Sequence, residues 1–255
     1  MRVIVTRPQS EARRWGRHLR ERGFDTLELP LISILPAPEL AAIESAWRTL
    51  AGVRAVMFVS GAAVRHFFAR RPAESPWPPT TRAWATGTGT RQALLDAGVD
   101  DGAIDAPQPH ATQFDSEALW QVVAGQATQG RRVLIVRGAE QGRDGAGRDW
   151  LAERLLANGV QVQSVTAYVR AAPQFSPEQM TQARRGADAG TVWLFSSSQA
   201  IAHLQALLPG QDWSKARAVA THPRIAQTAR NAGFGVVCES RPTEDAVIAA
   251  LESFR

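Results

Sequence analysis

The sequence predicts an α/β protein built from two copies of one parallel-sheet architecture. Short apolar runs alternate with amphipathic segments along the whole chain, which is typical of parallel strands joined by crossover helices. Residues 131–173 also repeat the pattern of residues 2–36, passing from an apolar run through a helical segment and a glycine into an extended run. Polar turns follow the strands at their carboxyl ends, where sheets of this kind bind ligands.

The first half of the chain opens with a strand, a turn at Thr6-Arg7-Pro8, a helix and an unusually long extended run. The elements expected here are strands at 3–6, 26–35, 53–60, 83–86 and 104–106 and helices at 9–22, 41–50, 61–68, 87–98 and 116–124. Four prolines among residues 72–79 permit only a loop in that segment.

The second half repeats this order with a glycine-rich loop expected at 138–147. The other expected elements are strands at 133–136, 161–171, 192–196, 219–221 and 236–238 and helices at 149–158, 177–185, 200–207, 223–232 and 243–254. From the duplication alone, we would expect two tandem halves that meet near Gly130.

Composition indicates an ordinary globular protein. A length of 255 residues suits two domains, and 44% hydrophobic with 21% charged residues is a usual balance. The chain begins directly with a strand rather than a signal peptide, and no apolar run approaches the roughly 20 residues that span a bilayer. One cysteine, Cys238, excludes an intrachain disulfide and a cysteine-rich metal site. We therefore expect a cytoplasmic protein without membrane contact.

The chain carries a net charge of +5, and this charge comes from arginine, since Lys215 is the only lysine. A genome rich in G and C would explain the excess of arginine, and attraction of a polyanion is the functional alternative. Nucleic acid is disfavoured as a partner because the arginines are spread along helices and no nucleic-acid-binding signature occurs. A small molecule with many carboxylates fits the charge equally well.

Familiar catalytic motifs are absent. The sequence has no HExxH, P-loop, GxSxG or CxxC motif and no metal-ligand spacing. The serines at 196–198 are best explained as helix caps rather than as nucleophiles. His66 and His203 occupy matching places in the two copies and are interpreted as helix residues rather than as metal ligands. For Tyr168, the only tyrosine, the simplest interpretation is a sheet residue.

Several short motifs together carry a family resemblance. In order they are Thr6-Arg7-Pro8, Phe58-Val59-Ser60 with Ala63-Val64, Ala85-Thr86-Gly87 with Thr90, Val165-Thr166-Ala167-Tyr168, and Phe195-Ser196-Ser197 with Ala200-Ile201. In their order and spacing they resemble the uroporphyrinogen-III synthase family over essentially the whole chain.

The resemblance implies two flavodoxin-like domains, each a three-layer parallel-sheet structure, joined by a two-stranded β ladder with a cleft between them. The two long extended runs become linker strands, at about 30–36 and 165–172. One domain then combines residues 1–35 with 172–255, and the other is the inserted segment 36–171. This division replaces the tandem halves that the duplication alone suggests.

The resemblance also implies a reaction in tetrapyrrole (heme) biosynthesis that needs neither cofactor nor metal. The enzyme cyclises hydroxymethylbilane with loss of water and inversion of ring D, giving uroporphyrinogen III. A monomer is expected, with a transient handover from hydroxymethylbilane synthase as a candidate partnership. The alternative is a non-enzymatic two-lobed binding or sensor protein for an anionic metabolite.

Site residues are assigned by matching the family's motifs to this sequence. The residues that match cleft-lining turns are Thr6, Ser60, Gly87, Thr90 and Ser197, and those expected to contact carboxylates are Arg7 and Arg137. Tyr168 matches the family's tyrosine, which is thought to help the hydroxyl depart. Two departures stand out: His222 and Ile225 replace the glycine and threonine of the equivalent turn, and the loop after Arg137 carries extra residues.

Overall fold

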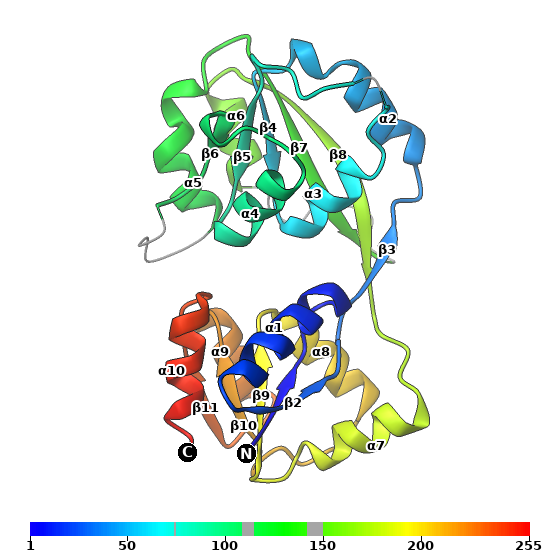
Figure 1. The fold of residues 1–255 in the computed structure, drawn as a ribbon, viewed down its shortest axis with the longest axis vertical. Helices are drawn as coiled ribbons and strands as arrows, with labels where there is room; N and C mark the ends of the chain where they lie inside the picture. Colours follow the sequence, from blue (N-terminus) through cyan, green and yellow to red (C-terminus); the bar gives the residue numbers. More distant parts are fainter. Residues whose placement is uncertain (74, 109–114, 142–149) are drawn as a thin grey trace. The chain divides into compact units, whose positions relative to one another are not determined.

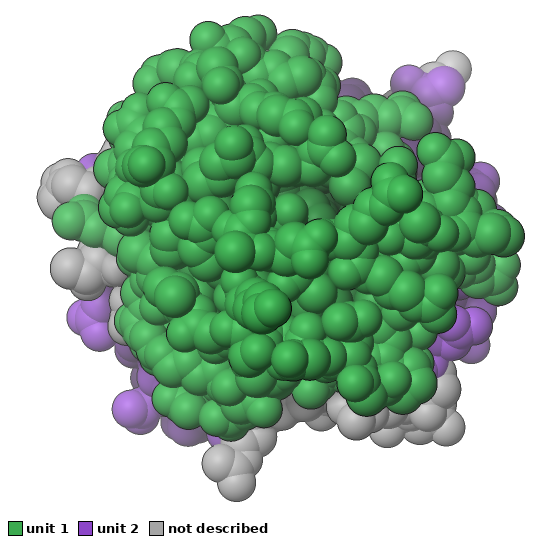
Figure 2. All heavy atoms as spheres, turned by 90° about the horizontal axis from the view of Figure 1, so that it is seen from below, with its two compact units in different colours: residues 1–34, 171–255 green, residues 35–170 purple. Residues whose placement is uncertain are grey.

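The computed structural model describes residues 1–73, 75–108, 115–141 and 150–255. The chain divides into two compact units, which Figure 2 distinguishes by colour. Unit 1 combines Met1–Ile34 with Ala171–Arg255, and unit 2 is Leu35–Arg170. The bounds expected from the sequence were 1–35 with 172–255, and 36–171. Each unit is an α/β structure around its own parallel sheet (Figure 1).

Unit 1 contains a five-stranded sheet in the order β11-β10-β9-β1-β2, with all neighbours parallel. The strands are β1 (Arg2–Val5), β2 (Asp25–Glu28), β9 (Thr191–Phe195), β10 (Arg217–Ala220) and β11 (Val236–Glu239). The helices are α1 (Gln9–Glu21), α7 (Pro177–Arg185), α8 (Ser198–Leu207), α9 (Pro223–Asn231) and α10 (Glu244–Glu252). Residues of β1 and β9 are buried on both faces, which explains their continuous apolar runs.

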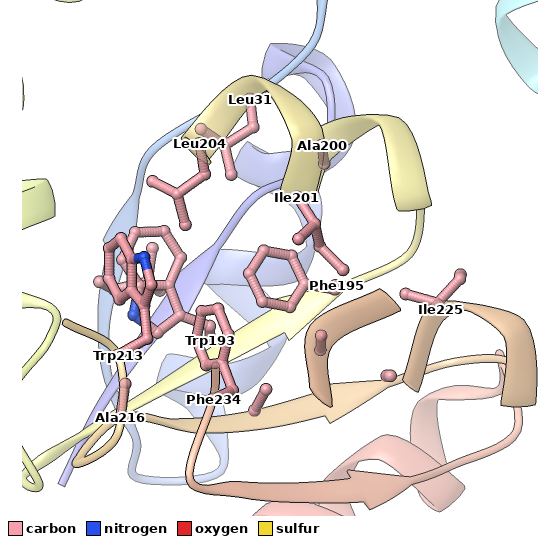
Figure 3. Packing of buried hydrophobic residues seen from close by; sticks show 14 of the residues in the cluster. Leu31, Trp193, Phe195, Ala200, Ile201, Leu204, Trp213, Ala216, Ile225 and Phe234 are labelled. Atoms are coloured by element: carbon pink, nitrogen blue, oxygen red, sulfur yellow. The ribbon is translucent and has the colours of Figure 1, made fainter. Parts of the chain in front are cut away.

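Successive residues of these strands belong to different hydrophobic cores, one on each face of the sheet. Val192 and Leu194 pack with apolar residues of α1 and α10, whereas Trp193 and Phe195 pack with residues of α8 and α9. In the second core, shown in Figure 3, the rings of Trp193 and Phe195 stack with centroids 5.8 Å apart. Because side chains alternate along a strand, the unit is a three-layer helix–sheet–helix structure.

Unit 2 contains a six-stranded sheet in the order β3-β8-β7-β4-β5-β6. The strands are β3 (Ser33–Pro36), β4 (Ala55–Phe58), β5 (Arg82–Ala85), β6 (Ile104–Asp105), β7 (Arg132–Glu140) and β8 (Gln161–Ala171). The helices are α2 (Leu40–Arg48), α3 (Gly61–Phe68), α4 (Thr88–Asp96), α5 (Ser116–Val123) and α6 (Trp150–Ala157). Short 3₁₀ turns occupy Leu50–Gly52, Asp101–Ala103 and Ala124–Gln126.

The duplication seen in the sequence reappears in the strand orders. The series β2-β1-β9-β10-β11 of unit 1 corresponds to β8-β7-β4-β5-β6 of unit 2. Tandem halves that meet near Gly130 are nevertheless wrong, because β1 pairs with β9 and β4 pairs with β7. One of the two sheet neighbours of the first strand, β9, thus lies far beyond residue 130, and a cut there would separate β1 from β9 and β4 from β7.

Most elements lie within two residues of their expected bounds at each end, and two differ by more. The extended run expected at 26–35 is two strands, β2 and β3, and Pro30 lies between them, where its missing N–H removes a donor from the ladder. Strand β7 continues to Glu140, although a loop was expected from Gly138, because pairing with β8 continues after a register shift between Arg137 and Gly138. Most of the expected loop, residues 142–149, lies outside the described residues.

Both strands that link the units, β3 and β8, are hydrogen-bonded neighbours in the sheet of unit 2 (Figure 1). Each ends at or crosses the boundary between the units, at Ile34–Leu35 and Arg170–Ala171. Within the parts of the chain that the structure describes, no helix has the length and apolar character needed to cross a membrane.

We predict that a fragment of residues 33–171 unfolds cooperatively, whereas a fragment of residues 1–130, of similar length, does not. The first fragment keeps all six strands of one sheet, whereas the second lacks β7 and β9 and leaves β4 and β1 each with one of their two sheet neighbours. Thermal melts followed by circular dichroism would show the difference. A cooperative melt of the 1–130 fragment would mean that the division into units is wrong.

Candidate active site

The candidate site residues of unit 2 lie along one edge of its sheet. Strands β8, β7, β4 and β5 are consecutive neighbours and parallel, so the turns at their carboxyl ends adjoin each other. Ser60 follows β4 and Gly87 follows β5, while Tyr168 lies near the end of β8. These are the polar turns that the sequence places at the carboxyl ends of the strands.

The hydroxyl of Tyr168 lies beside the turn that follows β4. Its side chain is almost buried, at 4% exposure, and its phenol oxygen lies 3.0 Å from Oγ of Ser60. Ser60 is the N-cap of α3, and its Oγ accepts a hydrogen bond of 3.2 Å from the backbone N–H of Ala63. The structure therefore brings together two residues that sequence matching selected, 108 positions apart in the chain.

A register shift between β7 and β8 places Tyr168 against a glycine. Arg137 pairs with Thr166 but Gly138 pairs with Tyr168, so Ala167 is the extra residue of a β-bulge. A Cβ atom on residue 138 would lie 2.4 Å from Cζ of Tyr168 and 2.8 Å from its oxygen. The phenol therefore occupies the space that any other side chain at this position would need. Sequence reasoning missed this role of Gly138, because the loop was expected to begin there.

His66 of α3 covers the tyrosine ring. The two ring centroids are 5.7 Å apart, with an angle of 30° between the planes. Burial lowers the pKa of His66, and the positive charge of Arg65 lowers it further. The imidazole is thus predominantly neutral near pH 7 and acts as a packing surface for Tyr168. The expectation that His66 is a helix residue is correct, but its contact with the tyrosine was not foreseen.

The matching histidine of unit 1 makes a different contact. Nδ1 of His203 lies 2.6 Å from the carbonyl oxygen of Leu31, and because a carbonyl only accepts, Nδ1 is the donor. Among the described residues, no group of three or more His, Cys, Asp or Glu side chains is arranged to hold a metal ion.

Thr6 directly follows β1, and its side chain forms a hydrogen bond to the adjacent strand β9. Its hydroxyl donates a hydrogen bond of 2.7 Å to the carbonyl of Leu194, and the residue is only 1% exposed. Thr86 makes the corresponding bond to Val59 in unit 2, at 3.2 Å. Such bonds join the ends of adjacent strands. The assignment of Thr6 to a cleft-lining turn stays a prediction, and in this structure the hydroxyl of Thr6 is bonded to the neighbouring strand.

The side chain of Arg7 packs against α1, the helix that follows it. Its guanidinium carbon lies 4.6 Å from the centre of the Trp15 ring, and Nη1 lies 3.3 Å from a carboxylate oxygen of Glu11. The side chain is 13% exposed, and burial lowers the pKa of the guanidinium. Nε is buried, with no hydrogen-bond partner among the described residues. The expected carboxylate contact would therefore have to compete with Glu11.

The other expected residues lie at helix N-termini or strand ends. Ser197 caps α8 by accepting a bond of 3.2 Å from the N–H of Gln199, which agrees with the capping role inferred from sequence. His222 caps α9 in the same way, with Nδ1 accepting from Arg224 at 3.1 Å. The side chain of His222 is exposed, and it caps α9, whereas the equivalent residue of unit 2, Gly87, gives α4 no side-chain cap.

In unit 2, Gly87 is the N-cap of α4, and Thr90 is buried in the first turn of that helix. Arg137 is half-buried in β7, opposite Thr166. The expected residues therefore form two groups, with Ser60, Gly87, Thr90, Arg137 and Tyr168 in unit 2 and the remaining three in unit 1.

Comparison with known proteins bears on both fold and family. The family described as uroporphyrinogen-III synthase HemD matches residues 13–249. A uroporphyrinogen-III synthase of Salmonella typhimurium is 28% identical over 260 residues, covering 99% of this chain and all of the relative.

Two solved structures share the fold. A uroporphyrinogen-III synthetase from Helicobacter pylori gives a TM-score of 0.61 at 14% identity, with full coverage of both chains. A mutant uroporphyrinogen III synthase from Thermus thermophilus gives 0.56 at 18% identity, covering 99% of each chain. At these identities the likeness concerns the fold, whereas the family match spans nearly the whole sequence. The chain therefore belongs to the uroporphyrinogen-III synthase family, hydro-lyases of tetrapyrrole biosynthesis.

Proposed function

We propose that this chain cyclises hydroxymethylbilane, with inversion of ring D, and that Tyr168 donates a hydrogen bond to the departing hydroxyl. Family membership supports the reaction, and the observation that supports the role of Tyr168 is its fixed hydroxyl, held by Ser60 beside the carboxyl ends of β7 and β4. The same hydroxyl lies beside the first turn of α3, where positive partial charge favours oxygen ligands.

The reaction begins when the substrate's pyrrole nitrogen expels the hydroxyl. The C–O bond breaks, its electron pair leaves with oxygen, and the remaining fragment is a cationic azafulvene. The substituted carbon of ring D attacks to give a spiro-pyrrolenine, which fragments and closes again with the ring inverted. The hydroxyl departs as water, and the proton lost from the pyrrole carbon on final closure restores the balance. A donor at the leaving oxygen therefore assists the first step.

Holding the substrate is the larger task, because hydroxymethylbilane cyclises unaided to the wrong isomer. Its eight carboxylates need many contacts, and the N-termini of helices present backbone N–H groups that suit anions. Helices α3 and α4 of unit 2 and α8 and α9 of unit 1 all begin at the expected turns. We infer that these turns bind carboxylates mainly through backbone N–H groups, since the serine side chains cap the helices. Correct orientation then favours the type III product.

We further expect the enzyme to act as a cytoplasmic monomer without a cofactor or metal, and to receive its substrate from hydroxymethylbilane synthase. The direct test incubates the pure protein with freshly generated hydroxymethylbilane and resolves the product isomers. The proposal predicts rapid formation of the type III isomer. A type I product at the uncatalysed rate would instead favour a binding or sensor protein.

Replacing Tyr168 with phenylalanine should lower kcat roughly ten- to a hundredfold, or about 1.4 to 2.7 kcal/mol of transition-state stabilisation. The effect is moderate because the pyrrole nitrogen already drives the hydroxyl out. The product should remain type III, since orientation depends on the turns. Steady-state rates and isomer analysis measure both expectations. An unchanged kcat in a fully folded Tyr168→Phe protein would restrict this tyrosine to a structural role.

Gly138→Ala should lower kcat at least as much as Tyr168→Phe, because the new Cβ would lie 2.4 Å from Cζ of the tyrosine and displace its ring. Gly125→Ala is the matched control, since a Cβ there meets nothing within 4 Å. The control should keep the wild-type rate. If Gly138→Ala also keeps it, the close seating of Tyr168 on Gly138 is not needed for catalysis.

A further inference from the structure

We propose that Ser60 is a positioning residue, which donates its hydroxyl proton to the phenol oxygen of Tyr168 and so turns the tyrosine's own proton outward. The proposal rests on the function proposed for Tyr168. It changes the role of Ser60 from a contact with substrate, as matched from sequence, to a contact with the residue that assists the leaving group.

The hydroxyl of Ser60 makes two hydrogen-bond contacts. A serine hydroxyl has one proton to donate and two acceptor sites. One acceptor site takes the N–H of Ala63, at 3.2 Å. The second contact joins Oγ of Ser60 to the phenol oxygen of Tyr168, at 3.0 Å, and either hydroxyl is able to supply its proton.

The two directions of this bond have opposite consequences. If Tyr168 donates to Ser60, its single proton is used inside the protein and cannot reach the departing hydroxyl. If Ser60 donates, the phenol oxygen is an acceptor and its own proton can point away from Ser60. Only the second direction lets Tyr168 act as a donor to substrate.

Because the ring of Tyr168 is packed against its neighbours, rotation of the hydroxyl is the main motion left to this side chain. Gly138 lies against one part of the ring, with its ideal Cβ position 2.4 Å from Cζ, and His66 stacks on the ring at 5.7 Å. A phenol hydroxyl prefers to lie in the plane of its ring, which gives it two orientations. With the ring fixed, the bond from Ser60 selects the orientation that points away from Ser60.

The same direction of donation builds a polarised chain. The N–H of Ala63 belongs to the first turn of α3, which carries the positive end of the helix dipole. It donates to Ser60, Ser60 donates to Tyr168, and Tyr168 donates to the leaving oxygen. Hydrogen bonds that run in one direction strengthen each other, so the helix N-terminus supports the donor at the end of the chain.

Unit 1 lacks this series of hydrogen bonds. Ser197 occupies the equivalent turn after β9 and also caps its helix, accepting from Gln199 at 3.2 Å. Tyr168 is the only tyrosine of the protein, so Ser197 has no phenol to orient. Equivalent serines therefore have different tasks in the two units.

A double-mutant cycle tests the proposal. Ser60→Ala should lower kcat about three- to tenfold, which corresponds to one ordinary hydrogen bond, and should leave KM nearly unchanged. In the Tyr168→Phe background, Ser60→Ala should have no further effect on kcat, because no phenol remains to be oriented. An equal loss in both backgrounds would overturn the proposal, since Ser60 would then act independently of the tyrosine.

The cap needs separate controls, because Ser60→Ala also removes the N-cap of α3, at a cost of about 1 kcal/mol of stability. Ser176→Ala removes the capping box of α7 and should show a similar loss of stability with an unchanged kcat. Glycine is a better N-cap residue than alanine, so Ser60→Gly should lose less stability than Ser60→Ala. Its kcat should match that of Ser60→Ala, because both variants lack the hydroxyl. Ser60→Thr keeps the hydroxyl and should retain most of the rate, so a loss equal to that of alanine would count against the proposal.

These outcomes separate two failures. If Tyr168→Phe leaves kcat unchanged, the proposed role of the tyrosine fails, and the positioning role fails with it. If Tyr168→Phe slows the reaction but Ser60→Ala has the same effect with and without the phenol, only the positioning role is wrong.

Discussion

The candidate site depends on the pairing of β7 with β8 and on the register shift within it. Because Ala167 is an extra residue, Tyr168 lies opposite Gly138, the residue whose missing side chain makes room for the phenol. Parallel pairing with β4 then brings Ser60 within 3.0 Å of the tyrosine hydroxyl. Without the shift, the tyrosine would have a different partner on β7, and the hydrogen bond to Ser60 would not follow from the sheet geometry.

The duplicated architecture supplies two similar sets of turns, but only one carries a tyrosine. Both units present helix N-termini at the carboxyl ends of parallel strands, which suits a substrate with many carboxylates. In the proposed mechanism the chemistry is more local than the binding, since it uses one hydroxyl of unit 2, which contacts Ser60 and whose ring packs against Gly138 and His66. The proposal assigns the larger task to orientation of the reactive substrate and a single hydrogen-bond donor to departure of its hydroxyl.

Sequence alone predicted the parts of this protein that depend on local pattern. Apolar runs and polar turns located the strands, and motif order selected Tyr168 and Ser60 as candidate site residues, which the structure places in contact. The features it missed depend on tertiary pairing. The bulge at Ala167 is visible only in the register between β7 and β8, and without that register Gly138 looks like the start of a loop. The inward bond of Thr6 likewise depends on the neighbouring strand β9, almost 200 residues away.

In the proposed mechanism Tyr168 assists the departure of the hydroxyl while the surrounding turns orient the substrate. The most direct measurement compares wild type and Tyr168→Phe on hydroxymethylbilane and on its O-acetyl ester, with each rate taken relative to the uncatalysed rate of the same substrate. Acetate leaves without proton assistance, so the substitution should cost roughly ten- to a hundredfold with the hydroxyl substrate and less than about threefold with the ester. An equal loss with both substrates would contradict the claim, because the tyrosine would then act on a step that does not depend on the leaving group.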